Sequence, residues 1–437
     1  MRNNLIFLIF YLIIGCSPKI NLELDIEDLK KEGETVFQNN NLSTNQEEFF
    51  KISKVSLYPI KKNIINWNYP NFSSSNLIPH VQFDKKFSIY KNNSYFVNRK
   101  KNIYKKEILT SNGKIVYIDD ESNLFILDEN LKLLKKLKIY KNKYYSNYSL
   151  KFSMVISNSI LYVADNLGAI FAYNLNDGKI LWKNNLGVPF LSNLAISQNN
   201  IFTTNSNGKL YSFDILTGKQ NWSYETGTDV AKSYGAYKMG IFNDKLVFSN
   251  DFGTILCLDL SQKKVIWKYT FEYSPSSTDN NIFEVSNIVL ENNSLYISST
   301  YGKFLKLDLS SGRRLWSGDI SSSLTSVLNV DTVSIISKNG FFHILEKSTG
   351  KPVYKKNIIN LLKLKKNNKK DTHLNNIFLA SEIFYITTSN GYIFLIDSSD
   401  LESVQYKKIS QKIISNIAIL NNKAFFIGNN GTLFKIQ

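Results

Sequence analysis

Short apolar runs separated by turn residues recur along most of the chain. In the stretch NGKLYSFDILTGKQNW, residues 207–222, an alternating run is followed by Asp214 and Gly218 and then by a second run that ends at Trp222. Alternation with a period of two is typical of half-buried β-strands, and a segment from Asp to Gly has the composition of a tight turn. The pattern therefore predicts a strand–turn–strand unit at each recurrence.

These recurrences keep a fixed register when the chain is aligned with itself. Seven units begin at glycines spaced 38 to 51 residues apart, namely Gly168, Gly208, Gly253, Gly302, Gly340, Gly391 and Gly431. A weaker eighth copy lies at residues 121–128. Fourteen residues after five of the glycines stands a large aromatic residue: Trp182, Trp222, Trp267, Trp316 and Tyr354. A register kept through four tryptophans indicates an internal repeat of eight units.

Two more apolar runs precede each glycine, so each unit supplies four strands. Four-stranded units of about 45 residues predict an all-β fold, an eight-bladed β-propeller, in which the tryptophans pack against neighbouring blades. The last unit stops before its tryptophan-bearing strand, and residues 63–70, NIINWNYP, offer a strand with Trp67. We therefore expect this N-terminal strand to complete the last blade and close the ring, which leaves no free sheet edge at the seam.

The N-terminus has the layout of a secretory signal peptide. Arg2 precedes an apolar run of about ten residues, which is too short to span a bilayer, and Gly15 and Cys16 follow. The ending Ile-Ile-Gly-Cys resembles the bacterial lipobox, which implies lipidation of Cys16, and Ser17 after it implies outer-membrane sorting. The alternative is an ordinary signal peptide in which Cys16 is incidental. We expect a lipoprotein signal peptide at 1–15, an acidic tether at 16–58 and the propeller at 59–437.

Charge and candidate chemistry narrow the function further. The chain has 437 residues and a net charge of +17, but its basic residues are nearly all lysines, which argues against specific nucleic-acid binding. Its two cysteines and three histidines do not have metal-ligand spacing. We therefore expect no catalytic residue, no cofactor and no metal site. The lysine-rich stretch 362–373 is either a solvated loop or an electrostatic contact for anionic lipid or an acidic partner.

The segments FAYNLNDGKILW, YSFDILTGKQNW and LKLDLSSGRRLW resemble the tryptophan-docking motif of eight-bladed quinoprotein-type propellers. One branch of that group comprises dehydrogenases that bind pyrroloquinoline quinone (PQQ) and calcium. The other comprises the BamB-like lipoproteins of outer-membrane β-barrel assembly. The lipobox, the tether and the absence of an adjacent cysteine pair favour the BamB-like branch. Two alternatives are a propeller module for another envelope partner and a quinoprotein dehydrogenase.

The BamB-like resemblance implies a non-catalytic scaffold, lipid-anchored at the periplasmic face of the outer membrane. It implies a monomer within a larger complex that binds the POTRA domains of the central barrel subunit. Two loop motifs carry that contact in the family, and they match this chain only in part, at residues 231–235 and 284–286. The resemblance therefore implies partner-binding roles for Tyr234, Gly235, Glu284 and Ser286.

Overall fold

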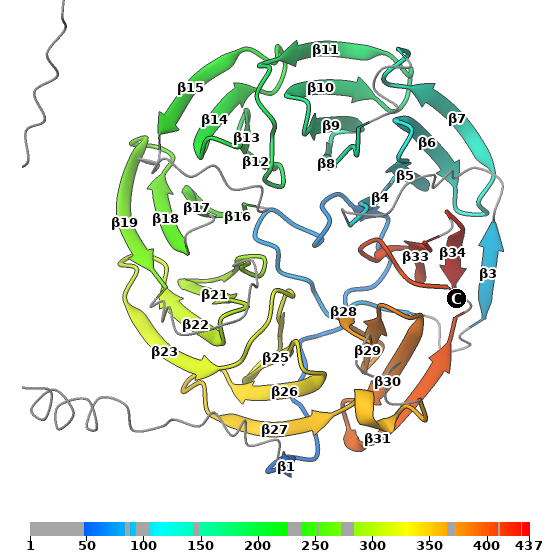
Figure 1. The fold of residues 1–437 in the computed structure, drawn as a ribbon, viewed down its shortest axis with the longest axis vertical. Helices are drawn as coiled ribbons and strands as arrows, with labels where there is room; N and C mark the ends of the chain where they lie inside the picture. Colours follow the sequence, from blue (N-terminus) through cyan, green and yellow to red (C-terminus); the bar gives the residue numbers. More distant parts are fainter. Residues whose placement is uncertain are drawn as a thin grey trace, which may run out of the picture. The chain divides into compact units, whose positions relative to one another are not determined.

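Eight antiparallel sheets surround a central axis in the computed structural model (Figure 1). The structure describes residues 48–83, 88–92, 105–142, 148–225, 237–250, 253–271, 284–364, 372–409, 411–429 and 431–437. The expected signal peptide, Cys16 and most of the expected tether lie outside these residues. The prediction of an all-β, eight-bladed propeller is confirmed.

Each blade has four strands that run in order from the axis to the rim, and the first four blades follow one another along the chain. Blade 1 contains β4 (Ile108–Ser111), β5 (Lys114–Ile118), β6 (Asn123–Asp128) and β7 (Leu133–Lys138). Blade 2 contains β8 (Phe152–Ser157), β9 (Ile160–Asp165), β10 (Ala169–Asn174) and β11 (Ile180–Asn185). Blade 3 contains β12 (Ala195–Ser197), β13 (Asn200–Thr204), β14 (Lys209–Asp214) and β15 (Gln220–Glu225). Blade 4 contains β16 (Met239–Phe242), β17 (Lys245–Ser249), β18 (Thr254–Asp259) and β19 (Lys264–Thr270).

The remaining blades continue around the ring. Blade 5 contains β20 (Val289–Glu291), β21 (Ser294–Ser298), β22 (Lys303–Asp308) and β23 (Arg314–Asp319). Blade 6 contains β24 (Val327–Leu328), β25 (Thr332–Ile336), β26 (Phe341–Glu346) and β27 (Pro352–Asn357), and the 3₁₀ helix η2 (Ile359–Leu361) follows it. Blade 7 contains β28 (Leu374–Ala380), β29 (Ile383–Thr388), β30 (Tyr392–Asp397) and β31 (Asp400–Lys408). Blade 8 contains β32 (Ala418–Leu420), β33 (Lys423–Ile427), β34 (Leu433–Ile436) and β3 (Ile89–Asn92).

The repeated tryptophans join each outer strand to the next blade. Trp182 of blade 2 lies over the turn of blade 3, where its indole Nε1 donates to the carbonyl of Ile215 at 3.1 Å. A Cβ atom on Gly218 in that turn would come within 2.3 Å of the ring, so the site requires glycine. Trp267 and Trp316 repeat the arrangement, with Nε1 donating to the carbonyls of Leu309 and Lys347.

Other side chains take the tryptophan position in some blades. In blade 1 it is Lys135, whose Nζ donates to the carbonyls of Asp177 and Gly178 of blade 2, each at 3.3 Å. In blade 6 it is Tyr354, whose hydroxyl donates to the carbonyl of Leu401 of blade 7 at 2.8 Å. The joint therefore depends on a side chain that reaches the next turn rather than on indole itself.

An N-terminal strand completes the last blade, as expected, but it is not the strand that carries Trp67. The outer strand of blade 8 is β3, which pairs with β34 and places Tyr90 opposite Lys435. Trp67 lies in β2 (Asn66–Trp67), which pairs with the inner strand β4 of blade 1 and is almost fully buried. The expected seam at residues 63–70 was wrong because Trp67 imitates an outer-strand residue, whereas Tyr90 lacks that signal.

Residues 61–83, which we call the axial segment, cross the middle of the ring (Figure 1). Backbone carbonyls of the segment accept hydrogen bonds from residues at the far ends of inner strands in six blades. The pairs are Ile65 with Asn112, Asn68 with Ile156, Ser74 with Ile241, Ser75 with Leu290, Val81 with Ser381 and Ile64 with Asn421. The segment therefore binds blades 1, 2, 4, 5, 7 and 8 together.

The propeller unit begins at Glu48, so it includes residues 48–58 that we expected in the tether. The strand β1 (Phe49–Phe50) adds to the outer edge of β27 in blade 6. Tyr58 donates to Glu291 at 2.9 Å and accepts from Lys347 at 2.8 Å, and those two residues form an ion pair at 2.6 Å. The tether boundary is corrected because these contacts fix the segment to blades 5 and 6.

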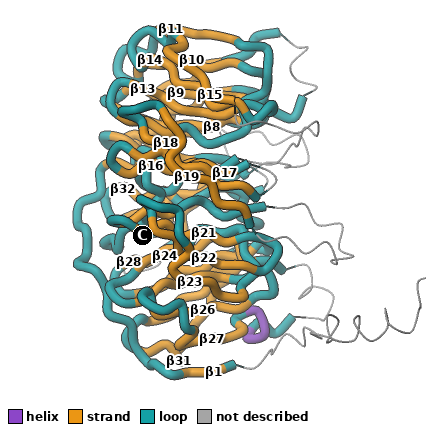
Figure 2. The backbone as a smooth tube through the Cα atoms, turned by 90° about the vertical axis from the view of Figure 1, so that its left-hand side faces the viewer, coloured by secondary structure: helices purple, strands orange, loops and turns teal. Residues whose placement is uncertain are grey.

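The edge-on view shows strands crossing the thickness of the ring, with loops on its two faces (Figure 2). Among the described residues, no helix has the length and apolar character needed to cross a bilayer.

Asn76 tests whether the axial segment stabilises the ring. Its buried Nδ2 donates to the carbonyls of Met239 and Ile288, at 2.8 and 2.9 Å, and its φ is +55°. Asn76→Ala should lower the free energy of unfolding by roughly 2–4 kcal/mol, measured by urea denaturation, because both carbonyls lose a donor and alanine disfavours this φ. Asn76→Gly removes the amide without that strain. Its free energy of unfolding should still fall by most of the amount seen for Asn76→Ala. A glycine variant as stable as wild type would contradict the role of the amide.

Candidate functional site

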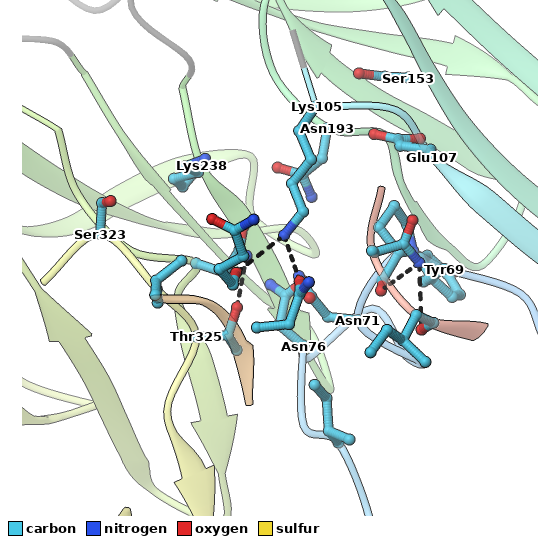
Figure 3. A pocket seen from close by; sticks show the side chains of 18 of the residues that line it. Tyr69, Asn71, Asn76, Lys105, Glu107, Ser153, Asn193, Lys238, Ser323 and Thr325 are labelled. Carbon is cyan, nitrogen blue, oxygen red and sulfur yellow. Dashed lines mark hydrogen bonds between the residues drawn. The ribbon is translucent and has the colours of Figure 1, made fainter. Parts of the chain in front are cut away.

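A cavity of about 410 Å³ lies on the propeller axis, above the axial segment (Figure 3). Trp67, Tyr69, Asn71, Asn76 and Ile78 of that segment line it from below. Residues just before or at the start of the inner strands line its sides. Since the axial segment contacts the opposite ends of the inner strands, it closes the cavity at that end, and the described residues leave the other end open.

One residue from each blade contributes to the side wall. Each stands fifteen positions before the first glycine of its repeat, with Ser122 in the place of that glycine in blade 1. We call these eight residues the axial ring: Glu107, Ser153, Asn193, Lys238, Asn287, Thr325, Asn376 and Asn416. The same backbone position in every blade therefore delivers a polar side chain to the axis.

The axial ring also joins neighbouring blades. Asn416 of blade 8 accepts from the amide of Ile108 in blade 1 at 2.9 Å and donates to its carbonyl at 3.0 Å. Asn193 of blade 3 makes the same pair of bonds with Met239 of blade 4, at 2.9 and 3.1 Å. Glu107 accepts from the amide of Met154 at 2.6 Å. The wall of the cavity is thus built from contacts that hold the blades in place.

The sequence carries a local signal for three positions of this ring. The motif Ser-Asn followed by an apolar residue occurs before Leu194, Ile288 and Ile417, each time at the same distance from the repeat glycine. The serine hydroxyl donates to the asparagine carbonyl in each copy and accepts an amide from the adjacent strand. The motif fixes the asparagine at the channel wall.

Three charged side chains of the cavity, the exposed Lys105 and the half-buried Glu107 and Lys238, have pKa values shifted by the surrounding protein. Lys105 donates to Oδ1 of Asn376 at 2.5 Å, and burial together with repulsion from Lys238 lowers its pKa to about 8. Burial also lowers the pKa of Lys238. Burial raises the pKa of Glu107 to about 7, although the amide of Met154 and nearby lysines oppose the shift. Burial penalises the charged form of all three groups.

The expected partner-binding residues fall in different places. Tyr234 and Gly235 lie outside the described residues. Glu284 is exposed at the cavity, where its amide donates to the Thr300 hydroxyl at 3.0 Å. Ser286 is buried, and its hydroxyl bonds Asn287 and Ser298. Of Glu284 and Ser286 in the second loop motif, only Glu284 is exposed and available to a partner.

The donor set does not fit a metal-bound quinone. The carboxylates that line the cavity within the described residues are Glu107 and Glu284, and lysines lie beside them. The described residues contain no group of three or more His, Cys, Asp or Glu side chains that could hold a metal ion. Cys257 is buried in blade 4, and burial raises the pKa of its thiol to about 12.

Comparison with known proteins identifies the repeat. The sequence profile of a family described as outer membrane protein assembly factor BamB matches residues 146–356. The assembly factor BamB of Legionella pneumophila (strain Paris) is 25% identical over 137 residues, which make up 30% of this chain. The matched stretch spans about a third of that relative, 34% of its length.

Solved structures share the fold. The crystal structure of BamB from Moraxella catarrhalis has a TM-score of 0.63 at 14% identity and covers 80% of this chain and 98% of its own. A europium-containing methanol dehydrogenase has a TM-score of 0.64 at 11% identity, and the match covers 83% of this chain and 89% of the dehydrogenase. The blades are BamB-like PQQ-type repeats, and the architecture by itself is common to a scaffold and to an enzyme.

Glu107 gives the wall of the cavity a defined pH dependence. Because its folded-state pKa is raised from 4.5 to about 7, its contribution to stability is complete below pH 4.5 and is lost as the pH rises towards 7. Glu107→Gln keeps an acceptor for the Met154 amide but cannot ionise. The variant should therefore gain stability relative to wild type between pH 4.5 and 7, and the difference should level off above pH 7. Urea denaturation across this range measures it, and a difference that does not change with pH would exclude the shift.

Proposed function

We propose that this chain, a ring of BamB-like repeats, is a non-catalytic scaffold of outer-membrane β-barrel protein assembly. It binds the POTRA region of the central barrel subunit at the periplasmic face of the outer membrane. The observation that carries the proposal is the BamB family match across residues 146–356, within an eight-bladed propeller whose last blade is closed by an N-terminal strand.

The described geometry supports a scaffold because neighbouring blades are joined at the rim and at the axis. Trp182 and its equivalents hold the rim, while Asn193, Asn416 and Glu107 hold the axis. Because the blades are fixed to one another at the rim and at the axis, the loops between them keep fixed spacings. A partner that binds several loops therefore costs little conformational entropy in the loops.

The channel mouth is the face we assign to the partner. Both partial matches to the family motifs, residues 231–235 and 284–286, come just before inner strands, β16 and β20. Glu284 is exposed there and brings a negative charge to a wall that also contains Lys238. This arrangement favours a POTRA surface with a basic group opposite Glu284.

The choice between scaffold and enzyme rests on the cavity. A quinoprotein dehydrogenase of this fold would need carboxylates gathered around a metal, and Glu107 and Glu284 of the described wall are not gathered in that way. A propeller module for a different envelope protein would use the same face, so the partner itself must be identified.

Affinity capture tests the partner. The full chain, captured from detergent-solubilised envelopes, should bring the barrel subunit with it, and a purified POTRA fragment should bind directly. Glu284→Lys should weaken that binding about tenfold, or about 1.4 kcal/mol, because it reverses the exposed charge. Tyr234→Ala should also weaken it, because aromatic residues often anchor interfaces.

Glu402→Lys is the matched control, since it makes the same charge reversal on the exposed outer strand of blade 7. It should bind like wild type. Capture of a different envelope protein without any barrel-assembly component would reject the proposed function in favour of another binding module.

Lipid anchoring is tested at Cys16. Because the lipobox places the acyl chains on this residue, Cys16→Ser should move the protein from the membrane fraction to the soluble periplasmic fraction while leaving it folded. Intact-mass analysis of the wild-type protein should show a mature chain that begins at an acylated Cys16. A mature N-terminus elsewhere, without acyl mass, would show that Cys16 is incidental.

A further inference from the structure

Two lysines that line the axial cavity, the half-buried Lys238 and the exposed Lys105, lack the carboxylate partners that Lys106 and Lys347 have. Lys106 forms an ion pair with Asp120, and Lys347 forms one with Glu291 at 2.6 Å. Within the described part of the chain, Lys105 and Lys238 have no carboxylate within ion-pair distance.

Of these four lysines, Lys238 has the fewest polar contacts at its ammonium group. It occupies the axial-ring position of blade 4, and its Nζ forms no hydrogen bond with any residue that the structure describes (Figure 3). Glu284 and Glu107 are near enough to attract it without pairing with it. Lys105 bonds only to neutral oxygens, Oδ1 of Asn376 at 2.5 Å and the carbonyl of Asn375 at 3.4 Å.

The half-buried ammonium group of Lys238 is held among blades without a paired carboxylate, which is unfavourable, and binding an anion relieves that cost. Lysines in such settings are found preferentially at functional sites. We propose that the axial cavity binds a small organic acid, whose carboxylate is held between Lys238 and Lys105.

The carboxylates of the wall favour a ligand with one negative charge at the lysine pair. Glu107 and Glu284 attract Lys238 and would repel a second charge placed beside it, although Lys106 and Lys151 also line the cavity. The remaining lining is rich in amides and hydroxyls, including Asn287, Ser323 and Thr325. Such groups suit a ligand with hydroxyl or amide substituents beside its carboxylate.

The size and closure of the cavity fit a molecule of the size of one sugar unit. Its volume of about 410 Å³ falls in the lower part of the range for small-molecule sites. Tyr69 and Tyr237 add ring surface to the lining. The axial segment closes the far end, so the ligand enters through the mouth and its carboxylate meets Lys238 and Lys105 inside. A monocarboxylated amino sugar has all of these features.

Two sugars that differ by one carboxylate provide the test. N-acetylmuramic acid carries a lactyl carboxylate that N-acetylglucosamine lacks. Isothermal titration of the full chain should give saturable binding of N-acetylmuramic acid, with N-acetylglucosamine at least tenfold weaker. Lys238→Gln and Lys105→Gln should each weaken the acid at least tenfold and leave the neutral sugar unchanged. Lys264→Gln, on the exposed outer strand of blade 4, is the matched control and should bind like wild type.

Three results would overturn the proposal: no saturable binding of N-acetylmuramic acid, equal binding of the two sugars, or unchanged binding by Lys238→Gln. Thermal denaturation of each variant checks that it remains folded. The outcome is separate from the proposed partner, because Lys238→Gln that loses the acid should bind the POTRA fragment like wild type, whereas Glu284→Lys should bind the fragment about tenfold more weakly.

Discussion

The structure depends on the contact between each blade and the next. A four-stranded sheet of this size cannot bury both of its faces alone, so each blade is stable only against its neighbours. The chain makes this contact at two radii, with a tryptophan or its substitute at the rim and a polar side chain at the axis. Under Trp182 the rim contact requires a turn without a Cβ, at Gly218, whereas the axial contact requires an amide or carboxylate that reaches one strand further, as at Asn416.

The axial contacts have a consequence for function because the same side chains form the channel wall. Asparagine serves well there because it can donate and accept at once, as Asn193 does with Met239. Where a blade places a lysine at the ring position instead, as at Lys238, the side chain contributes charge to the cavity rather than a joint between blades. Variation within one repeated position can therefore add a binding property without changing the architecture.

The sequence predicted the architecture well because the features that define the repeat are local in sequence. Alternation, turn glycines and the position of Trp182 or Trp222 are all set by neighbouring residues along the chain. The seam was missed because it depends on which distant strand reaches the free edge, and Trp67 satisfied the local pattern of an outer strand better than Tyr90 did. The axial ring was missed for a different reason. Glu107, Lys238 and Asn416 share a position in the repeat but differ in side-chain type, and the arrangement of blades around the axis shows that this position faces the channel.

The closing strand also determines when the protein can finish folding. Tyr90 pairs with Lys435, so the last blade cannot form until nearly the entire chain has emerged. Contacts this distant in sequence slow folding, because a very long loop must be closed before they stabilise anything. Until then β34 has an open edge that can pair with other chains. During synthesis this protein is therefore expected to need the same protection from aggregation as the unfolded barrels whose assembly we propose it serves.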